Sequence, residues 1–392
     1  MDRIDSALLR QRVAAVEADL VAASISALAV YAPGSALGNQ AGAHAWLRFL
    51  CDFDGVNTPS LLVLRPGRPP SLLTGRKFHM RPRTAESRLW FDDVRHVAPR
   101  DFGRHAAPLL REAGRRIAWL GYDETPAPVW QAVALPDIDW VFDFDRRIAR
   151  HRVRKGAAEL AFHRAAAAAC DAVFDALARA VPAGLPGYRL QAAMAHAARD
   201  AGCDYCDTWL TVAPAADFFR YNLDEGLRGP RPGDQLLAGV MLTVDGHWGH
   251  AVRTGTVGGP TPAQSRLYGI CRDMFDAALD ALRPGEDLCR VDDAMDTVLH
   301  RHYAEGEVRR TRSGHGLGYA YEDPVASQAF PNAWEKDGRP REPVEALPGM
   351  LLELHPHLFV PDVGGAMIGD MVLVTETGWE LLTRHPRDPL VW

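Results

Sequence analysis

The sequence predicts an α+β protein of two domains, and three observations lead to this fold class. The composition is globular, with 47% hydrophobic and 24% charged residues, and 392 residues suffice for more than one hydrophobic core. Short apolar runs alternate with helix-length segments over residues 1–150. Residues 151–392 instead repeat one plan of two helices followed by strands. We therefore expect a smaller α/β domain at 1–150 and a larger domain at 151–392.

The first domain should begin with a charged amphipathic helix, MDRIDSALLRQRVAAVEADL. Strands are expected where apolar runs are bounded by glycine, proline and polar residues. These strands lie at 25–31, 59–64, 71–75 and 116–122, with a helix near 103–113. The arginine-rich stretch 143–155 is the expected domain boundary.

The second domain contains two copies of a helix-break-helix unit, each leading into strands. The first copy has helices at 156–180 and 187–201 with a Pro/Gly break at 181–184. The second copy starts at Thr261-Pro262, breaks at 283–285 and continues over 288–304. A threonine N-cap followed by proline is a typical helix start. Two copies indicate an internal duplication, which would place a functional site between the halves.

Charge and hydropathy exclude several classes of protein. The chain has 44 Lys and Arg against 50 Asp and Glu, a formal net charge of −6, and the charges are interspersed. Such a surface has no basic field for nucleic acid or an anionic membrane. The start has no leader-like apolar segment, and no stretch reaches about 18 uninterrupted apolar residues. We expect a cytoplasmic protein without nucleic-acid or membrane partners.

Six scattered cysteines do not form a disulfide framework, which agrees with a reducing compartment. The pair Cys203 and Cys206 has metal-ligand spacing, but a second pair is missing. We expect ordinary buried thiols.

A β-hairpin carries the first candidate site residue. Strands 235–244 and 247–256 flank Asp245-Gly246, which predicts a type I′ turn. This turn places Met241 opposite His250, with Gly239 as a diagonal neighbour. A surface histidine is the simpler alternative.

Two further segments carry histidines. Ser313-Gly-His315-Gly-Leu-Gly318 brackets a histidine with glycines that allow backbone and substrate to approach closely. In Glu353-Leu-His355-Pro-His357, period-two alternation directs Glu353, His355 and His357 to one face of a strand. The alternative is that these histidines pack in the core and have no functional role.

The order of these motifs resembles the creatinase and aminopeptidase P family, which has the pita-bread fold. The resemblance rests on His250 followed by Arg253-Thr254, on 314–318, on Gly349-Met350 with Pro356, and on 369–378. It implies a pita-bread catalytic domain behind a creatinase-like N-terminal domain, an Xaa-Pro peptidase-like sequence, and a homodimer.

The family's peptidases bind two metal ions through Asp, Asp, His, Glu and Glu. By this resemblance the five positions are Gly239, His250, His315, His355 and Gly369. Two ligands are thus glycine, and two carboxylates are histidine. Because carboxylates bridge and neutralise two cations, we do not expect a standard dinuclear Xaa-Pro peptidase.

Creatinase and ectoine hydrolase, the non-peptidase branch of the family, break C–N bonds without a metal. We expect hydrolysis of a C–N bond in a small polar nitrogenous substrate, with His250 and His315 as acid and base. His355 and Glu353 would orient groups or stabilise charge, and one imidazole would be neutral and another cationic. The carboxylate-to-histidine changes make the pocket less anionic and favour a substrate with a carboxylate.

Further residues are candidates for substrate binding. The family's loop histidine falls near Arg220 or Tyr221, and Arg253 would contact substrate or pair with a carboxylate. The remaining candidates are His357, Tyr319 and Tyr321. In creatinase-like dimers the N-terminal domain covers the other subunit's site, which adds Trp46, Arg48, Arg76 and His79 unless these are ordinary structural residues.

Two alternatives stay open. Metal-free chemistry requires no cofactor, but His250, His315 and His355 would also suit one zinc or iron ion, giving a hydrolase, a lyase or an oxidative enzyme. The other alternative is a non-catalytic binding module on the same fold.

Overall fold

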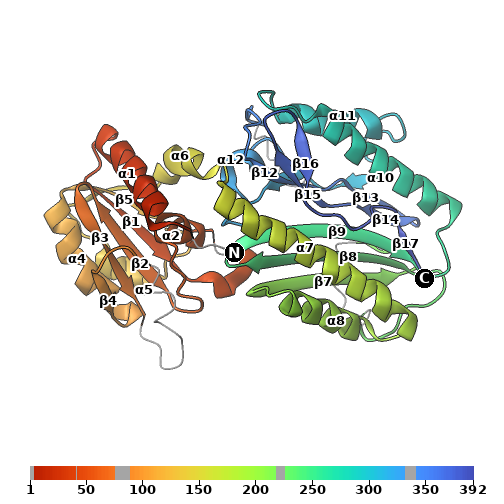
Figure 1. Ribbon diagram of the computed structural model, residues 1–392, viewed down its shortest axis with the longest axis horizontal. Coiled ribbons are helices and arrows are strands. Elements are labelled where there is room, and N and C mark those ends of the chain that lie inside the picture. The colour runs from red at the N-terminus through yellow and green to blue at the C-terminus, as the bar shows by residue number, and fades with distance from the viewer. Residues whose placement is uncertain (1–3, 41, 76–88, 218–225, 332–340) are drawn as a thin grey trace. The chain divides into compact units, whose positions relative to one another are not determined.

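The computed structural model describes residues 4–40, 42–75, 89–217, 226–331 and 341–392 (Figure 1). The chain divides into two compact units, Met1–Arg152 and Val153–Trp392. Each unit is described by itself.

The first unit contains one six-stranded mixed sheet in the order β4-β3-β2-β1-β5-β6. Its strands are β1 (Ala27–Ala32), β2 (Ser60–Arg65), β3 (Arg68–Thr74), β4 (Val94–His96), β5 (Arg116–Leu120) and β6 (Asp139–Val141). The central strand β1 runs antiparallel to β2 and parallel to β5. All four predicted strands are present. Sequence reasoning missed β4 and β6, since three residues are too few to show alternation.

Helices cover this sheet and complete its core. They are α1 (Ser6–Ala22), η1 (Ser35–Gln40), α2 (His44–Cys51), η2 (Pro99–Asp101), α4 (Phe102–Ala113), α5 (Ala127–Val133), α6 (Phe144–Ile148) and η3 (Ala149–Arg152). Helix α4 buries Phe102, Ala106 and Leu110, which recur every four residues and face the sheet.

The second unit has the two helix pairs that the repeated plan predicts. Its helices are α7 (Ala157–Ala180), η4 (Val181–Ala183), α8 (Gly187–Asp200), α10 (Pro262–Ala281), α11 (Cys289–Leu299) and α12 (Pro324–Ser327). Helix α10 starts with a capping box, in which the Gln264 N–H donates to Thr261 Oγ1 at 3.2 Å. The Thr261 N–H in turn donates to Gln264 Oε1 at 2.9 Å. Helix α11 ends at Leu299, five residues before the predicted end.

Three sheets complete the second unit. Their orders are β17-β9-β8-β7, β11-β12-β15-β16 and β10-β13-β14. The strands are β7 (Tyr205–Ala213), β8 (Gln235–Val244), β9 (His247–Thr256), β10 (Arg309–Arg310), β11 (Gly314–Gly316), β12 (Leu351–Leu354), β13 (His357–Val360), β14 (Gly364–Met367), β15 (Asp370–Val374), β16 (Trp379–Leu381) and β17 (Leu390–Val391).

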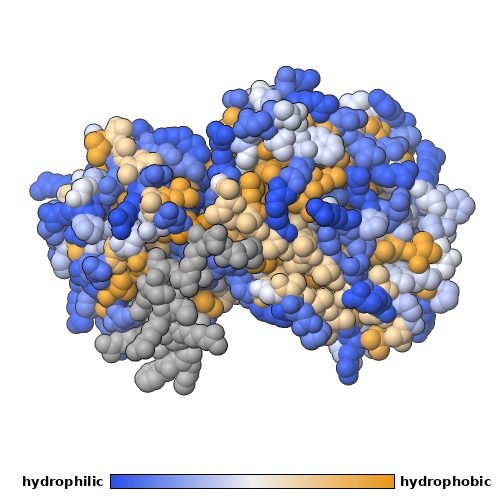
Figure 2. All heavy atoms as spheres, in the orientation of Figure 1, coloured by the Kyte–Doolittle hydropathy of each residue, from blue (hydrophilic) through white to orange (hydrophobic). Residues whose placement is uncertain are grey.

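Each helix pair packs on its own sheets, as an internal duplication requires. One hydrophobic core joins α7 and α8 to β7, β8 and β9, and another joins α10 and α11 to β12 through β15. Figure 1 shows α7 lying along the β7–β9 sheet. Figure 2 shows a moderately hydrophobic band along α7, whose outward positions include several of its alanines.

The predicted hairpin is confirmed in its bounds, turn and register. Asp245 and Gly246 have φ values of 47° and 73°, as a type I′ turn requires. Met241 lies opposite His250.

The segment 353–357 differs from the single strand that alternation predicts. Pro356 lacks an N–H for a strand ladder, and the run divides into β12 and β13, which belong to different sheets. Glu353 is therefore in β12, His357 is in β13, and His355 lies in the connection.

Candidate metal centre

Strands from both halves of the second unit bring the candidate residues together. His250 is on β9, and His315 on β11 lies directly opposite Glu353 on β12. A bridge between Val252 and Gly369 joins β9 to the segment that leads into β15, the neighbour of β12. The site therefore lies between the halves, as the duplication suggested.

Three imidazoles converge on one carboxylate oxygen. Glu353 Oε2 lies 3.5 Å from His250 Nδ1, 3.5 Å from His315 Nε2 and 3.2 Å from His355 Nε2. All four residues are at most 5% exposed. We call these four residues the histidine cluster. It contains every catalytic residue that the sequence predicts.

Burial disfavours the charged form of each residue in the cluster. Desolvation lowers the pKa of His250 to about 3 and places those of His315 and His355 well below the usual range. It also raises the pKa of Glu353 well above its usual range. These shifts favour neutral imidazoles, which offer nitrogen lone pairs, over the cationic imidazole that the sequence analysis expects.

The cluster holds buried polar atoms without hydrogen bonds. These atoms are both carboxylate oxygens of Glu353, His315 Nε2 and His355 Nδ1. Leaving one such group unsatisfied costs about 1–3 kcal/mol. Ligand atoms of His250, His315 and Glu353 all lie within 4.8 Å of one another. Imidazole and carboxylate donors suit zinc, iron or manganese, so these residues fit a single divalent ion.

The two-metal site of the resembled peptidases does not fit this chain. A Cβ atom built on Gly239 would lie 2.2 Å from the Trp209 ring, and one on Gly369 would lie 2.3 Å from Glu353 Oε1. An indole therefore fills the space beside Gly239, and the Glu353 carboxylate fills the space beside Gly369, the two positions where the resemblance implies that a ligand is replaced.

Tyr321, rather than Tyr319, contacts the histidine cluster. The Tyr321 hydroxyl lies 2.9 Å from His250 Nδ1, and its ring centroid is 4.8 Å from that of His315. The Tyr319 ring packs instead on His247 at 4.6 Å. Of the two candidate tyrosines, Tyr321 therefore lies against the cluster, and Tyr319 packs on His247 instead.

Arg253 pairs with a carboxylate, which is one of the two roles that the sequence analysis gives it. Its guanidinium donates to Asp370 Oδ1 at 2.7 Å and to the carbonyl oxygens of Val252, Gly369, His385 and Pro386. These bonds use its donor groups and join β9 to the C-terminal segments.

Other predicted residues lie beside the cluster or elsewhere. The ring of His357 is buried, with its centroid 4.7 Å from that of His355. Trp46 and Arg48 are buried in helix α2 of the first unit, where Arg48 pairs with Asp52 at 2.9 Å. The remaining candidates, Arg220, Tyr221, Arg76 and His79, lie outside the described residues.

The glycines around His315 allow strands to pack closely. A Cβ atom on Gly314 would lie 2.5 Å from the Glu353 carbonyl oxygen, and one on Gly316 would lie 2.7 Å from the Asp323 Cβ. Gly314 therefore lets β11 pack closely on β12, and Gly316 lets it pack closely on the segment at the start of α12.

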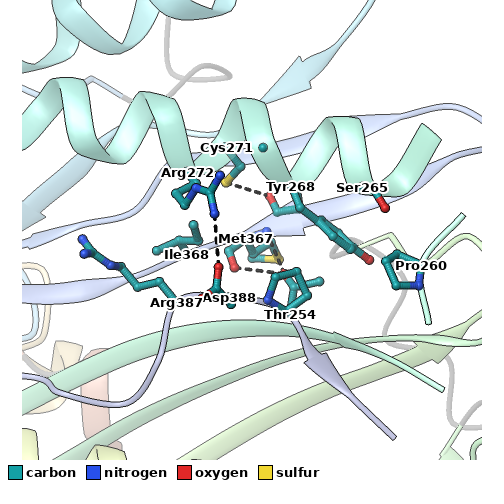
Figure 3. A pocket seen from close by; sticks show the side chains of 13 residues that line it. Thr254, Pro260, Ser265, Tyr268, Cys271, Arg272, Met367, Ile368, Arg387 and Asp388 are labelled. Carbon is teal, nitrogen blue, oxygen red and sulfur yellow. Dashed lines mark hydrogen bonds and ion pairs between the residues drawn. The ribbon is translucent and has the colours of Figure 1, made fainter. Parts of the chain in front are cut away.

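A separate cavity of about 200 Å³ lies between α10, β14 and the C-terminal segment (Figure 3). Thr254, Tyr268 and Cys271 line it, and an ion pair of 3.2 Å joins Arg272 to Asp388 at its edge. None of the histidine cluster lines this cavity.

In the part of the chain that the structure describes, no helix is both long and apolar enough to cross a membrane. The six cysteines are free, and five of them are buried.

Relatives of known sequence match part of the chain. Agropine synthesis cyclase of Rhizobium rhizogenes is 32% identical over 155 residues, which is 38% of this chain and 36% of the relative. Uncharacterized peptidase SH1217 of Staphylococcus haemolyticus is 32% identical over 139 residues, which is 34% of this chain and 35% of the relative. The chain thus spans little more than a third of the length of these relatives.

Solved structures match the fold over the whole chain. Dipeptidase PepE from Mycobacterium ulcerans has a TM-score of 0.76 at 24% identity, covering 100% of this chain and 99% of that one. X-Pro aminopeptidase from Thermotoga maritima has a TM-score of 0.78 at 15% identity, covering 97% and 99%. These matches confirm the predicted α+β pita-bread fold with its N-terminal domain.

The model of metallopeptidase family M24 matches residues 161–376, which is more than half of the 392-residue chain. The match includes His250, His315, Glu353 and His355, and the relatives above agree with it. The chain therefore belongs to metallopeptidase family M24.

Proposed function

We propose that this protein is a hydrolase that binds one divalent metal ion through His250, His315 and Glu353 and cleaves a C–N bond in a small substrate. The observation that carries the proposal is the convergence of three imidazoles on one buried carboxylate oxygen that has no hydrogen-bond partner. A peptide bond is itself a C–N bond, and the relatives include proteins named as peptidases.

The roles of the residues follow from their geometry. A bound ion would act as a Lewis acid on a carbonyl group and lower the pKa of water. His250, His315 and Glu353 would hold it, and His355 lies close enough to orient Glu353 or to act as a fourth ligand. Tyr321 places an exchangeable O–H within 2.9 Å of His250 Nδ1, where it can deliver a proton to the departing nitrogen.

Metal-free acid–base catalysis is the competing proposal, and the neutrality of the cluster favours it. A Glu353 carboxyl with a raised pKa can donate a proton, and a neutral imidazole can accept one. This is the chemistry expected from the resemblance to creatinase and ectoine hydrolase. The cytoplasmic location and the homodimer also stay predictions.

Metal analysis separates the two proposals. We expect about one equivalent of zinc, iron or manganese per chain in untagged protein purified without chelator. The variants His250→Ala, His315→Ala and Glu353→Gln should lose it, while the control His196→Ala, at an exposed position on α8, should retain it.

The other outcomes are equally informative. Protein that takes up no metal after incubation with Zn²⁺, Fe²⁺ or Mn²⁺ would overturn the metal proposal and leave metal-free catalysis. A correctly folded His315→Ala/His355→Ala double variant that keeps its biological activity would instead support the binding module.

A further inference from the structure

We propose that the cavity beside helix α10 binds a small aromatic compound that carries an anionic group. This is the cavity of Figure 3, and none of the histidine cluster lines it. The inference therefore does not depend on the proposed function. It assigns a second, separate binding site to the second unit.

Two adjoining cavities form the proposed site. The first, which we call the apolar cavity, is the one of about 200 Å³ between α10, β14 and the C-terminal segment. The second, which we call the arginine cavity, has about 480 Å³ and is lined mainly by residues from 381–388. Arg272, Arg387 and Asp388 line both cavities, so one ligand can occupy the two together.

The apolar cavity has room for one aromatic ring. Tyr268, Met367 and Ile368 are among the residues that line it. A cavity of about 150 Å³ with apolar walls binds benzene, so this one also accommodates a short linker. Two of its polar groups are already engaged. Thr254 Oγ1 donates to the Met367 carbonyl oxygen at 2.9 Å, and the Tyr268 hydroxyl accepts a hydrogen bond of 2.8 Å. The part of the ligand in this cavity should therefore be apolar.

The arginine cavity has an excess of basic residues. Its arginine and aspartate residues are Arg272, Arg384, Arg387, Asp370 and Asp388. Asp370 already accepts a hydrogen bond from Arg253 at 2.7 Å. In Figure 3 the guanidinium groups of Arg272 and Arg387 lie at the opposite end from Tyr268. A ligand whose ring fills the apolar cavity would thus bring its other end to the arginines, which favours an anionic group there.

Arg387 has hydrogen-bond donors that the protein does not use. Its guanidinium lies over the Phe275 ring, with 5.0 Å between Cζ and the ring centroid. Nη1 is buried and lies 3.6 Å from Asp276 Oδ1, which is too far for a hydrogen bond. Among the residues that the structure describes, none accepts a hydrogen bond from this nitrogen.

An anionic ligand would use these donors. The Arg387 side chain is 31% exposed, so part of it is open to the two cavities that it lines. A guanidinium presents paired N–H groups that match the oxygens of an anionic group. A charged acceptor also forms a stronger hydrogen bond than a neutral one.

Three probes test the two halves of the site. Phenylacetate has a ring and a carboxylate, phenylacetamide has the ring and a neutral amide, and acetate has the carboxylate alone. We expect isothermal titration calorimetry to show the tightest binding for phenylacetate, with the other two at least about tenfold weaker.

Two variants remove the two halves separately. Arg387→Gln should weaken the binding of phenylacetate about ten- to a hundredfold and leave that of phenylacetamide unchanged. Gly269 lines the apolar cavity, and nothing lies within 4 Å of an added Cβ atom. Gly269→Leu should therefore fill the cavity without a clash and abolish the binding of both ring compounds. Arg290→Gln is the matched control, since it removes an exposed arginine on α11 that pairs with Glu286.

Several results would overturn the inference. These are equal binding of phenylacetate and acetate, binding of neither, wild-type binding of phenylacetate by Arg387→Gln, or its binding by Gly269→Leu. Circular dichroism of each variant establishes folding.

His315→Ala keeps this inference apart from the proposed function. This variant should lose the metal ion and still bind phenylacetate as the wild type does. Loss of phenylacetate binding in folded His315→Ala would place the ligand at the histidine cluster and overturn the inference. A wild-type protein that takes up no metal but binds phenylacetate through Arg387 would contradict the proposed function alone.

Discussion

His163 shows at the scale of one residue how burial controls protonation outside the cluster. It is 1% exposed, and its Nδ1 lies 2.9 Å from the Trp248 carbonyl oxygen, to which a neutral imidazole donates. Desolvation lowers its pKa to about 3, whereas an unfolded chain has a histidine pKa of about 6.5. Between these values the unfolded chain binds a proton that the folded protein excludes.

This difference predicts the sign of a pH effect on stability. As pH falls from about 6.5 toward about 3, protonation of His163 in the unfolded chain should lower the free energy of unfolding by up to about 1.4 kcal/mol per pH unit. His163→Gln should remove that part of the slope. Urea unfolding near pH 7 and near pH 5 measures it. The exposed His196→Gln is the control, and an unchanged slope in His163→Gln would contradict the assignment.

Sequence reasoning identified all four residues of the histidine cluster but did not distinguish between the two candidate tyrosines. The direction of His250 follows from a two-residue turn and the strand register, whereas His315, Glu353 and His355 were singled out by the glycine-bracketed and Glu-x-His-Pro-His motifs. Tyr319 and Tyr321 follow a glycine-rich turn, where no regular period applies. Their directions depend on contacts with His247 and His250 that only the folded chain provides.

Strand β12 and the segment before β15 pack closely because the Glu353 side chain occupies the space beside Gly369. A Cβ on Gly369 would lie 2.3 Å from Glu353 Oε1 and 3.0 Å from the Val252 side chain. We expect Gly369→Ala to reduce the free energy of unfolding by about 1–3 kcal/mol. The double variant Gly369→Ala/Glu353→Ala should lose less than the sum of the two single changes.

A double-mutant cycle in urea checks this coupling. Gly269→Ala is the control, because nothing lies within 4 Å of its added Cβ on helix α10. That substitution should be neutral or stabilise the protein by about 0.5–1 kcal/mol. Additive losses in the Gly369 cycle would show that Glu353 does not fill this space.

The elements themselves were largely predictable, and the exceptions have physical causes. The hairpin and the start of α10 depend on local turn and capping residues, which can be recognised in the sequence. Pro356 breaks a run that alternation alone reads as one strand. The Glu353 side chain occupies the space beside Gly369. Alternation could not predict this contact, because it depends on how β12 aligns with β15.

At the scale of the whole molecule, the cluster joins the two halves of the second unit. His250 belongs to the sheet of β7, β8 and β9, while His315 and Glu353 belong to that of β11 and β12. A bound ion would therefore resist separation of the halves. At about one hundred times its dissociation constant, it should add about 2.7 kcal/mol to the free energy of unfolding.

Thermal unfolding with and without chelator measures this stabilisation. We expect chelator to lower the melting temperature of the wild type but not that of His315→Ala. Tryptophan fluorescence also reports on unfolding of the first unit, because Trp119, Trp130 and Trp140 form an aromatic cluster there. A chelator effect that is equal in the wild type and in His315→Ala would place the metal elsewhere.

The Trp209 indole leaves no space for a larger residue at position 239. Converting Gly239 to aspartate places the new side chain against an indole only 2.2 Å from its Cβ. Shrinking Trp209 first would open a void in a packed region, at a cost of about 3–5 kcal/mol. Either order of the two substitutions passes through a less stable protein. Packing against Trp209 therefore disfavours a carboxylate side chain at position 239, whichever of the two substitutions comes first.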